Sequence, residues 1–418
     1  MKVLVVGGGG REHAICWKLA QSPKVTELYC APGNAGIAQV ATCVPVKATD
    51  VEGMVAWAKE NAMDFVMVAP DDPLALGMVD ALEAAGIPAF GPKANAAIIE
   101  ASKAFSKELM KKYNIPTAQY ETFTELNKAL AYIREQGAPI VVKADGLALG
   151  KGVVVAATVE EAEQAVREMM EDKKFGASGS TVVIEECMVG PEVTVLAFCD
   201  GEHLVPMLSS QDHKRAYDGN QGPNTGGMGA FCPSPNYTPE IAEFCQKNIF
   251  IPTVEALKAE GRPFKGVIYF GLMLTEKGPR VVEYNARFGD PETQPLLSML
   301  DTDLLDIFQA CVDGTLDKID VKWKDGAACC LVLASGGYPV SYQSGYPISG
   351  LEEAGKSAVV FHAGTKRNEE GQLVNAGGRV LGVTAVGADL NEAISKAYAA
   401  AKPISWTDMH FRTDIGKV

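Results

Sequence analysis

The first hundred residues alternate short β-branched runs with amphipathic stretches, and this alternation restricts the fold more than any other feature of the sequence. Strands are predicted over residues 3–6, 27–30, 65–68 and 88–90, and helices over residues 12–20, 51–61 and 77–85. Strands and helices in turn indicate βαβ units and a doubly wound parallel sheet. A sheet of this kind binds its ligands at the carboxyl ends of its strands.

Beyond residue 100 the periodic segments are less regularly spaced. Ser102 is a candidate N-cap for a helix that runs to residue 113. Further strands are predicted over residues 140–144, 153–157, 181–186, 267–274, 280–285 and 329–335, and further helices over residues 159–171, 241–257 and 390–401. A Gly/Asn/Pro-rich stretch covers residues 211–235, and a hairpin is predicted across residues 369–371.

These segments predict a multidomain protein of the α/β and α+β classes. We assign residues 1–101 to the doubly wound domain, residues 102–322 to a central domain and residues 323–418 to a small mixed α/β domain. A chain of 418 residues is too long for one ordinary core, and about two to four domains are expected at this length.

The composition is that of a globular protein with small-molecule partners. Hydrophobic residues make up 47% and charged residues 22% of the chain, which argues against a fibre or a disordered chain. The net charge of −14 disfavours general binding to nucleic acid or to anionic membranes. We therefore expect neither as a partner.

The ten cysteines are scattered, with no C-x-x-C spacing, so a zinc site or a disulfide framework is not expected. The apolar residues 1–6 run directly into glycines and are too short for a signal peptide, and no later apolar run reaches the roughly 20 residues of a spanning helix. We expect a cytoplasmic protein in a reducing compartment.

Four glycines at positions 7–10 follow the first predicted strand and open a helix, and a helix N-terminus attracts anions. In either register, a dinucleotide-binding G-x-G-x-x-G motif would need a glycine where Glu12 or His13 stands. Glu27 has the spacing of the acidic residue of that motif but precedes its strand. NAD binding is disfavoured, which leaves a sugar-phosphate site or a tight strand–helix turn.

Lys143 ends a buried strand immediately before the glycine-rich residues 145–152. A lysine in this place either presents its charge to a phosphate or is a solvated loop residue. Lys103, Lys107 and Lys111 share one helical face, which is typical of a solvated surface.

Carboxylates also cluster at the end of an apolar strand, where Glu185 and Glu186 are followed six residues later by Glu192. They are either ligands for ribose hydroxyls or ordinary solvated groups.

Residues 281–292 are the most informative stretch. Strand alternation points Glu283, Asn285 and Arg287 to one face. A carboxylate and a carboxamide oxygen suit Mg²⁺ bound together with nucleotide phosphates, and an adjacent arginine can hold an anion with two hydrogen bonds. Three polar residues in this arrangement are costly to bury without a function.

Taken together, these segments resemble the ATP-grasp carboxylate–amine ligases, and among them the glycinamide ribonucleotide synthetase family. The resemblance follows the family order over essentially the whole chain, with Arg287-Phe288-Gly289-Asp290-Pro291-Glu292 as its most specific part. The other segments that carry it are residues 3–13, 32–36, 143–152, 211–215, 224–230, 361–365 and 377–381.

The resemblance implies a two-lobed ATP-grasp fold for residues 102–322 and a step of purine synthesis as the activity. ATP, glycine and 5-phosphoribosylamine would give glycinamide ribonucleotide, ADP and phosphate, with Mg²⁺ or Mn²⁺ as the metal. The resemblance is consistent with a protein that is a monomer or a weak homo-oligomer.

The resemblance also implies site residues by motif position. The residues expected at ATP are Lys103, Lys143, Gly150, Lys151, Gly152, Glu185, Glu186 and Glu192. Those expected at glycine and phosphoribosylamine are Gly9, Gly10, Arg11, Asn34, Asp212, Thr225, Gly226, Gly227, Arg287 and Asp290. Glu283 and Asn285 would hold the metal, and Arg287, Asp212 and Lys143 would be catalytic. The small loop glycines 226, 227 and 229 would leave no room at the substrate for a side chain larger than that of glycine.

Two positions depart from the family pattern. Many ATP-grasp enzymes carry a further metal carboxylate on the preceding strand, where this chain has Tyr269-Phe270-Gly271-Leu272. Asp71 stands where the family often has glutamate, which shortens the reach of that carboxylate by one methylene.

Three rival functions are weighed against this expectation. Another ATP-grasp ligase of purine synthesis is disfavoured by the segments 224–230 and 287–292, and a nicotinamide-dependent oxidoreductase by Glu12 and His13. A catalytically silent nucleotide-binding regulator is disfavoured by the intact set of Glu283, Asn285 and Arg287.

Overall fold

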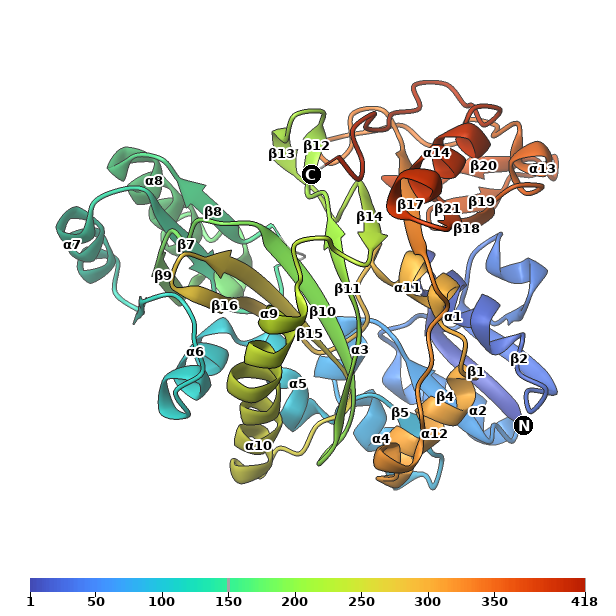
Figure 1. Ribbon diagram of the computed structural model, residues 1–418, viewed down its shortest axis with the longest axis horizontal. Coiled ribbons are helices and arrows are strands. Elements are labelled where there is room, and N and C mark those ends of the chain that lie inside the picture. The colour runs from blue at the N-terminus through green and yellow to red at the C-terminus, as the bar shows by residue number, and fades with distance from the viewer. Residues whose placement is uncertain (149–150, 418) are drawn as a thin grey trace.

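The structure, a computed structural model, describes residues 1–148 and 151–417 (Figure 1). A lobe that contains α7, α8 and β7–β9 lies at one end of the molecule. The N-terminal and C-terminal regions lie together at the other end, with long central strands between them. The predicted fold class, with a doubly wound N-terminal sheet and a central two-lobed unit, is confirmed.

The N-terminal sheet has five parallel strands in the order β3-β2-β1-β4-β5. Its strands are β1 (Lys2–Gly7), β2 (Glu27–Pro32), β3 (Thr42–Cys43), β4 (Phe65–Val68) and β5 (Ala89–Phe90), and its helices are α1 (Gly10–Leu19), α2 (Val51–Glu60), α3 (Asp71–Ala75), α4 (Met78–Ala84) and α5 (Ala94–Ala101). Successive β1 side chains pack into two different hydrophobic cores, Val3 on one face of the sheet and Leu4 on the other. The chain order reverses at β1, which is where a sheet of this kind binds ligands.

The outer lobe of the central region is a four-stranded antiparallel sheet in the order β6-β9-β7-β8. Its elements are α6 (Lys103–Lys112), β6 (Tyr120–Phe123), α7 (Leu126–Gln136), β7 (Ile140–Ala144), β8 (Val153–Ala156), α8 (Val159–Met170) and β9 (Val182–Glu186). The predicted N-cap is confirmed, because the Ser102 hydroxyl accepts a hydrogen bond from the Phe105 amide.

The second lobe belongs to an eight-stranded sheet in the order β16-β15-β10-β11-β14-β17-β21-β18, which continues into the C-terminal region. Its first strands are β10 (Glu192–Asp200), β11 (Leu204–Asp212), β14 (Gly229–Cys232), β15 (Lys265–Thr275) and β16 (Gly278–Asn285). The sequence analysis assigned no strand to β10, whose interior residues are buried on both faces and therefore show no alternation. The predicted hairpin of residues 267–274 and 280–285 is confirmed as β15–β16.

Two further segments of this lobe are more structured than the sequence patterns indicated. The Gly/Asn/Pro-rich stretch contains β12 (Arg215–Tyr217) and β13 (Gln221–Asn224) as well as β14, because its glycines permit tight turns between short strands. The helix predicted over residues 241–257 is longer and consists of α9 (Pro239–Cys245), a π-helical segment (Gln246–Phe250) and α10 (Ile251–Ala259).

The C-terminal region completes the sheet and covers it with helices. Its elements, after α11 (Thr293–Met299) and α12 (Leu304–Asp313), are β17 (Ala327–Ala334), α13 (Leu351–Ala354), β18 (Val359–His362), β19 (Thr365–Arg367), β20 (Leu373–Asn375), β21 (Arg379–Gly387) and α14 (Leu390–Ala401). The predicted hairpin across residues 369–371 is confirmed as β19–β20.

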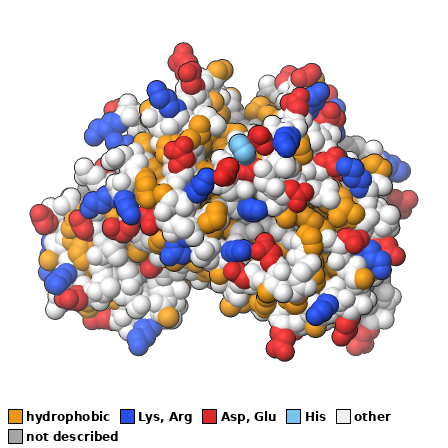
Figure 2. All heavy atoms as spheres, turned by 90° about the horizontal axis from the view of Figure 1, so that it is seen from below, with side chains coloured by type: hydrophobic (Ala, Val, Ile, Leu, Met, Phe, Trp, Pro, Cys, Tyr) orange, Lys and Arg blue, Asp and Glu red, His pale blue; other side chains and the backbone are white. Residues whose placement is uncertain are grey.

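No helix of residues 1–148 and 151–417 is both long enough and apolar enough to cross a membrane. The ten cysteines are free thiols. On the face shown in Figure 2, Lys and Arg side chains are interspersed with Asp and Glu and do not gather into one basic patch.

A buried histidine pair joins α1 to the C-terminal region. The His362 amide donates to His13 Nδ1 at 2.7 Å, so that nitrogen must be unprotonated. Burial, and next the proximity of His362, lowers the pKa of His13 to about 3. Burial, and next Arg367, lowers the pKa of His362 to about 4.

We expect acid to destabilise the protein through this pair. Between pH 6.5 and about 3 the unfolded chain takes up a proton that buried His13 does not, so the stability that neutral His13 contributes above pH 6.5 is lost as the pH falls through this range. In His13→Asn, whose Oδ1 can replace Nδ1 as the acceptor, this loss should be smaller, by at most roughly 1.4 kcal/mol per pH unit. Urea unfolding at several pH values measures the difference, and parallel curves for the two proteins would contradict it.

Candidate active site

The end of β16 presents a carboxylate and a carboxamide on one side of the strand. Glu283 and Asn285 are partly exposed, whereas Tyr284 between them is buried. This confirms the predicted alternation for the first two residues. Arg287, which was predicted to continue it, lies beyond the end of β16.

Cations surround Glu283. Lys214 Nζ lies 3.7 Å from Glu283 Oε1. Burial by itself would raise the pKa of Glu283, but Lys214, followed by Lys143, Lys103 and Arg287, holds it below the ordinary value. Glu283 is therefore an ionised carboxylate in a positive environment, which suits a site for a metal ion and phosphate groups.

Asn285 and Arg287 share a second acidic partner. The Asn285 amide is assigned with Nδ2 toward two acceptors, Glu100 Oε1 at 3.0 Å and the Tyr284 carbonyl at 3.3 Å, and this assignment leaves Oδ1 available on the other side of the amide. Arg287 Nη2 lies 3.1 Å from Glu100 Oε1. Glu283 and Asn285 thus offer oxygen donors of the kind that Mg²⁺ and Mn²⁺ accept. On the preceding strand Gly271 pairs with Glu283, so that position provides no further carboxylate.

Lys143 belongs to a buried ion cluster between the two sheets. Its Nζ donates to the Val282 carbonyl on β16 at 3.1 Å and lies 3.1 Å from Glu185 Oε1. Lys107 Nζ lies at the same distance from that oxygen and donates to Thr117 Oγ1 at 2.8 Å. The prediction of a solvated face for Lys107 is wrong, because its side chain is only 3% exposed. Burial lowers the pKa of Lys107 to about 8, while Glu185 opposes the shift.

The other predicted ATP residues are placed around this cluster. Lys103 Nζ donates to the Gly146 carbonyl in the glycine-rich loop at 3.1 Å. Glu186 is exposed at the end of β9 and lies 3.3 Å from Arg280. Lys151 is exposed and Gly152 buried, whereas Gly150 lies outside the described residues.

A second group of charges lies at the end of β11. Lys214 Nζ is 3.8 Å from Glu192 and 3.7 Å from Glu283, so it links two predicted site residues although sequence reasoning gave it no role. Burial raises the pKa of Asp212, and Lys214 opposes the shift. Burial, and next the charge of Asp212, raises the pKa of Glu292 to about 7.

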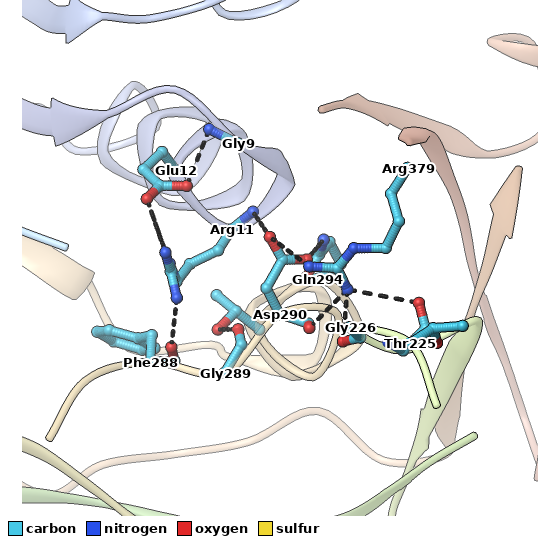
Figure 3. A network of polar contacts seen from close by, with 12 residues as sticks. Gly9, Arg11, Glu12, Thr225, Gly226, Phe288, Gly289, Asp290, Gln294 and Arg379 are labelled. Atoms are coloured by element: carbon cyan, nitrogen blue, oxygen red, sulfur yellow. Dashed lines mark hydrogen bonds and ion pairs between the residues drawn. The ribbon is translucent and has the colours of Figure 1, made fainter. Parts of the chain in front are cut away.

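The glycine turn after β1 is closed by the protein's own carboxylates (Figure 3). Glu12 Oε2 accepts a hydrogen bond from the Gly9 amide at 3.0 Å, and Asp290 Oδ2 accepts one from the Arg11 amide at 3.3 Å. The Arg11 guanidinium donates to Glu12 and to the Phe288 carbonyl. Two of the amides that the sequence offered to a substrate anion are therefore already satisfied. Gly10 lies in the same turn, where an added Cβ would meet Gln294 Nε2 at 2.6 Å.

Asn34 has a structural task in the same region. Its Nδ2 donates to the carbonyls of Gly8 at 3.0 Å and His362 at 2.8 Å, and its Oδ1 accepts from the amides of Gly36 and Ile37. The side chain thus fixes the loop after β2 against both β1 and the C-terminal region.

The loop that contains Thr225, Gly226 and Gly227 is held by the C-terminal region (Figure 3). Arg379 Nη1 donates to the Gly226 carbonyl at 2.7 Å and to the Asp290 carbonyl at 2.8 Å. The Gly226 amide donates to Tyr338 Oη at 2.9 Å. Arg379 lies in one of the segments that carry the family resemblance, but sequence reasoning gave it no role in the site. It is almost ninety residues from Asp290 in the chain, and no local motif links the two.

The loop glycines at positions 226, 227 and 229 are packed against other protein atoms. A Cβ added at Gly226 would meet Arg379 Cζ at 2.8 Å, and one added at Gly227 would meet Pro291 Cδ at 2.5 Å. At Gly229 the nearest atom would be Ile415 Cγ2, also at 2.8 Å. Packing within the protein is therefore one reason for small residues at these positions, and the crowding of the substrate by this loop stays a prediction.

Two sheets that bring lysines, carboxylates and an Asn–Glu oxygen pair together define a protein of the ATP-grasp class. The crystal structure of a biotin carboxylase from Campylobacter jejuni is similar in fold, with a TM-score of 0.76 at 14% identity. The match covers 98% of this chain and 92% of the biotin carboxylase chain. The crystal structure of a phosphoribosylamine–glycine ligase from Thermotoga maritima has a TM-score of 0.88 at 31% identity, with both chains fully covered.

The sequence comparisons identify the family within this class. Profiles of the phosphoribosylglycinamide synthetase N domain, ATP-grasp (A) domain and C domain match residues 1–100, 101–293 and 328–418. Phosphoribosylamine–glycine ligases from Vibrio parahaemolyticus and Rhizobium meliloti are 50% and 51% identical to the chain, with 100% of this chain and 98% of theirs covered. The chain belongs to the phosphoribosylglycinamide synthetase family.

Proposed function

We propose that this chain is an ADP-forming ligase that joins glycine to 5-phosphoribosylamine, giving glycinamide ribonucleotide in de novo purine biosynthesis. The observation that carries the proposal is the ionised Glu283 carboxylate beside Asn285, with Lys103, Lys143, Lys214 and Arg287 around it. Cations around oxygen donors of this kind stabilise the charge of a phosphoryl group during transfer. Membership of the family and the names of its members support the choice of substrates.

The chemistry requires no nucleophilic side chain. A carboxylate oxygen of glycine attacks the γ-phosphorus of ATP, the bond to the β–γ bridging oxygen breaks, and ADP leaves. The amine of phosphoribosylamine then attacks the acyl carbon of glycyl phosphate, and inorganic phosphate leaves. The attacking amine loses a proton, and we propose Asp212, the last residue of β11, as its acceptor. Arg287 would bind the transferred phosphoryl group.

The proposed ATP residues are those around the Lys143–Glu185 cluster together with Glu192, which lies beside Lys214. Lys103 and Lys143 would contact phosphates, together with the loop that contains Gly150, Lys151 and Gly152. Glu185, Glu186 and Glu192 would surround the adenosine. Glu283 and Asn285 would hold Mg²⁺ or Mn²⁺, which neutralises charge on the phosphates when it is bound.

The proposed substrate residues lie nearer the N-terminal and C-terminal regions. Gly9, Gly10, Arg11 and Asn34 would lie on the phosphoribosylamine side. Thr225, Gly226, Gly227 and Asp290 would border glycine. Residues 1–101 would thus bind phosphoribosylamine, residues 102–322 ATP, the metal and glycine, and residues 323–418 would complete the site.

The setting of the enzyme is part of the same proposal. We propose a cytoplasmic monomer or weak homo-oligomer that acts on small molecules, without a nucleic-acid or membrane partner. The free thiols suit a reducing compartment, and the net charge of −14 disfavours polyanions.

An isotope experiment tests the reaction type. With ATP, freshly made phosphoribosylamine and ¹⁸O-carboxyl glycine, we expect ADP as the nucleotide product and one ¹⁸O atom in inorganic phosphate, measured by mass spectrometry. Attack at the α-phosphorus would instead give pyrophosphate and place the label in AMP. That result would overturn the proposed acyl-phosphate chemistry.

The same assay separates the rival functions. ADP release with another amino acid but not with glycine would indicate a different ligase of the class. Absence of turnover with bound ATP would indicate a regulator, and NADH binding would favour the oxidoreductase.

A further inference from the structure

Glu100 lies in the last turn of α5 and reaches out of the N-terminal region to three consecutive residues after Tyr284. Its Oε1 lies 3.0 Å from Asn285 Nδ2 and 3.1 Å from Arg287 Nη2. Its Oε2 accepts a hydrogen bond from the Ala286 amide at 2.8 Å. The side chain is only 8% exposed, so few water molecules compete for these contacts.

The contact with Glu100 determines which way the amide oxygen of Asn285 points. With two acceptors on one side, Glu100 Oε1 and the Tyr284 carbonyl, the amide is assigned with Nδ2 toward them, and Oδ1 then points the other way. An amide rotated by 180° would turn its NH₂ group toward the metal position, where it could not serve as a ligand. A carboxylate at position 100 accepts but does not donate, and therefore allows one orientation only.

The same short segment also contacts the opposite lobe. Ser102 Oγ donates to Asp145 Oδ1 at 3.1 Å, and Lys103 Nζ donates to the Gly146 carbonyl at 3.1 Å. Within four residues the chain thus contacts the strand end that carries Asn285 and the glycine-rich loop after β7.

We propose that Glu100 is a positioning residue that fixes the metal-binding orientation of Asn285 and the direction of Arg287. The inference rests on the proposed function, because it assigns Asn285 to the metal. Residues that orient metal ligands typically alter metal affinity or activity by roughly 10–100-fold when they are replaced. Glutamine at position 100 has nearly the same shape as glutamate, but its NH₂ group replaces one of the two carboxylate oxygens. One of the groups that now donate to Glu100 would therefore lose its acceptor.

The test is a Mn²⁺ titration followed by electron paramagnetic resonance, in the presence of a non-hydrolysable ATP analogue. We expect Glu100→Gln to raise the Kd for Mn²⁺ about tenfold at unchanged stoichiometry, and to lower kcat about tenfold in the ADP-release assay. Glu83→Gln is the matched control, because Glu83 pairs with Lys93 on the surface of the same domain. It should leave both values within twofold of the wild type.

The outcomes separate the possible roles. A merely structural role would lower the number of Mn²⁺ sites without changing Kd, and this would overturn the proposal, as would a Kd within twofold of the wild type. If Glu100→Gln does not fold, the titration of Glu100→Asp, whose carboxylate is one methylene shorter, is judged by the same criterion. The Mn²⁺ titration needs neither glycine nor phosphoribosylamine. If the wild-type protein binds Mn²⁺ but releases no ADP in the presence of glycine and phosphoribosylamine, the proposed function is refuted and the positioning result is left intact.

Discussion

Glu283→Gln is expected to lower kcat about 100-fold while the fold is retained. Glutamine keeps one amide oxygen but removes the charge that faces Lys214, Lys143, Lys103 and Arg287. Loss of a charged metal ligand weakens stabilisation of the transferred phosphoryl group, and a factor of 100 corresponds to about 2.7 kcal/mol in the barrier. Initial rates of ADP release over a range of Mg²⁺ concentrations measure the effect, and circular dichroism checks the fold.

A control on the same hairpin isolates the role of the charge. Glu276 is exposed in the turn between β15 and β16, so Glu276→Gln removes a charge from the hairpin without touching the strand end. Its kcat should match that of the wild type. A folded Glu283→Gln protein with near-normal turnover at limiting Mg²⁺ would remove Glu283 from the proposed site.

Local patterns were sufficient for the parts of the site that lie on regular elements. The period of a strand placed Glu283 and Asn285 on one side of β16, with Tyr284 in the core. The cap at Ser102 fixed the start of α6 and thereby the position of Lys103. In both cases the side-chain direction follows from the backbone geometry of one element.

Helical spacing could not decide whether a lysine is buried. Lys103, Lys107 and Lys111 share one face of α6, but Lys111 is exposed whereas Lys107 is buried against Glu185. Glu185 comes from β9, almost eighty residues further along the chain. The partner that makes a buried ammonium tolerable is thus set by tertiary packing, which periodicity does not report.

The closure of the glycine turn after β1 was equally invisible in the sequence. The pattern of glycines at a helix N-terminus predicts free amides, and the acceptor for the Arg11 amide is Asp290, which lies 279 residues away. That carboxylate is itself placed by contacts to the C-terminal region. Whether the amides of this turn are free to bind an anion is therefore decided by Asp290, which no local motif connects with the turn.

Asp290→Ala is expected to destabilise the protein by about 3 kcal/mol, because it removes one carboxylate that three parts of the chain share. Asp290 Oδ1 accepts from Gln294 Nε2 at 2.8 Å, and Oδ2 accepts from the Arg11 amide and lies 3.8 Å from Arg379 Nη2 (Figure 3). Burial by itself would raise the pKa of Asp290, but Arg379 and then Arg11 hold it below the ordinary value, so the group is ionised. Urea unfolding at pH 7 measures the change in the free energy of unfolding.

The source of that loss can be separated by a double-mutant cycle with Arg379→Met. If Asp290 and Arg379 act together, the double variant should lose at least about 1 kcal/mol less than the sum of the single variants. Asp325→Ala, at an exposed aspartate before β17, is the matched control and should change stability by less than about 0.5 kcal/mol. Additive losses would show that Asp290 stabilises only its local helix and the turn after β1. A coupling would mean that one charge pair, Asp290 with Arg379, holds both the loop of Thr225–Gly227 and the turn at Arg11. A substrate contact at one of these segments would then change the stability of the other.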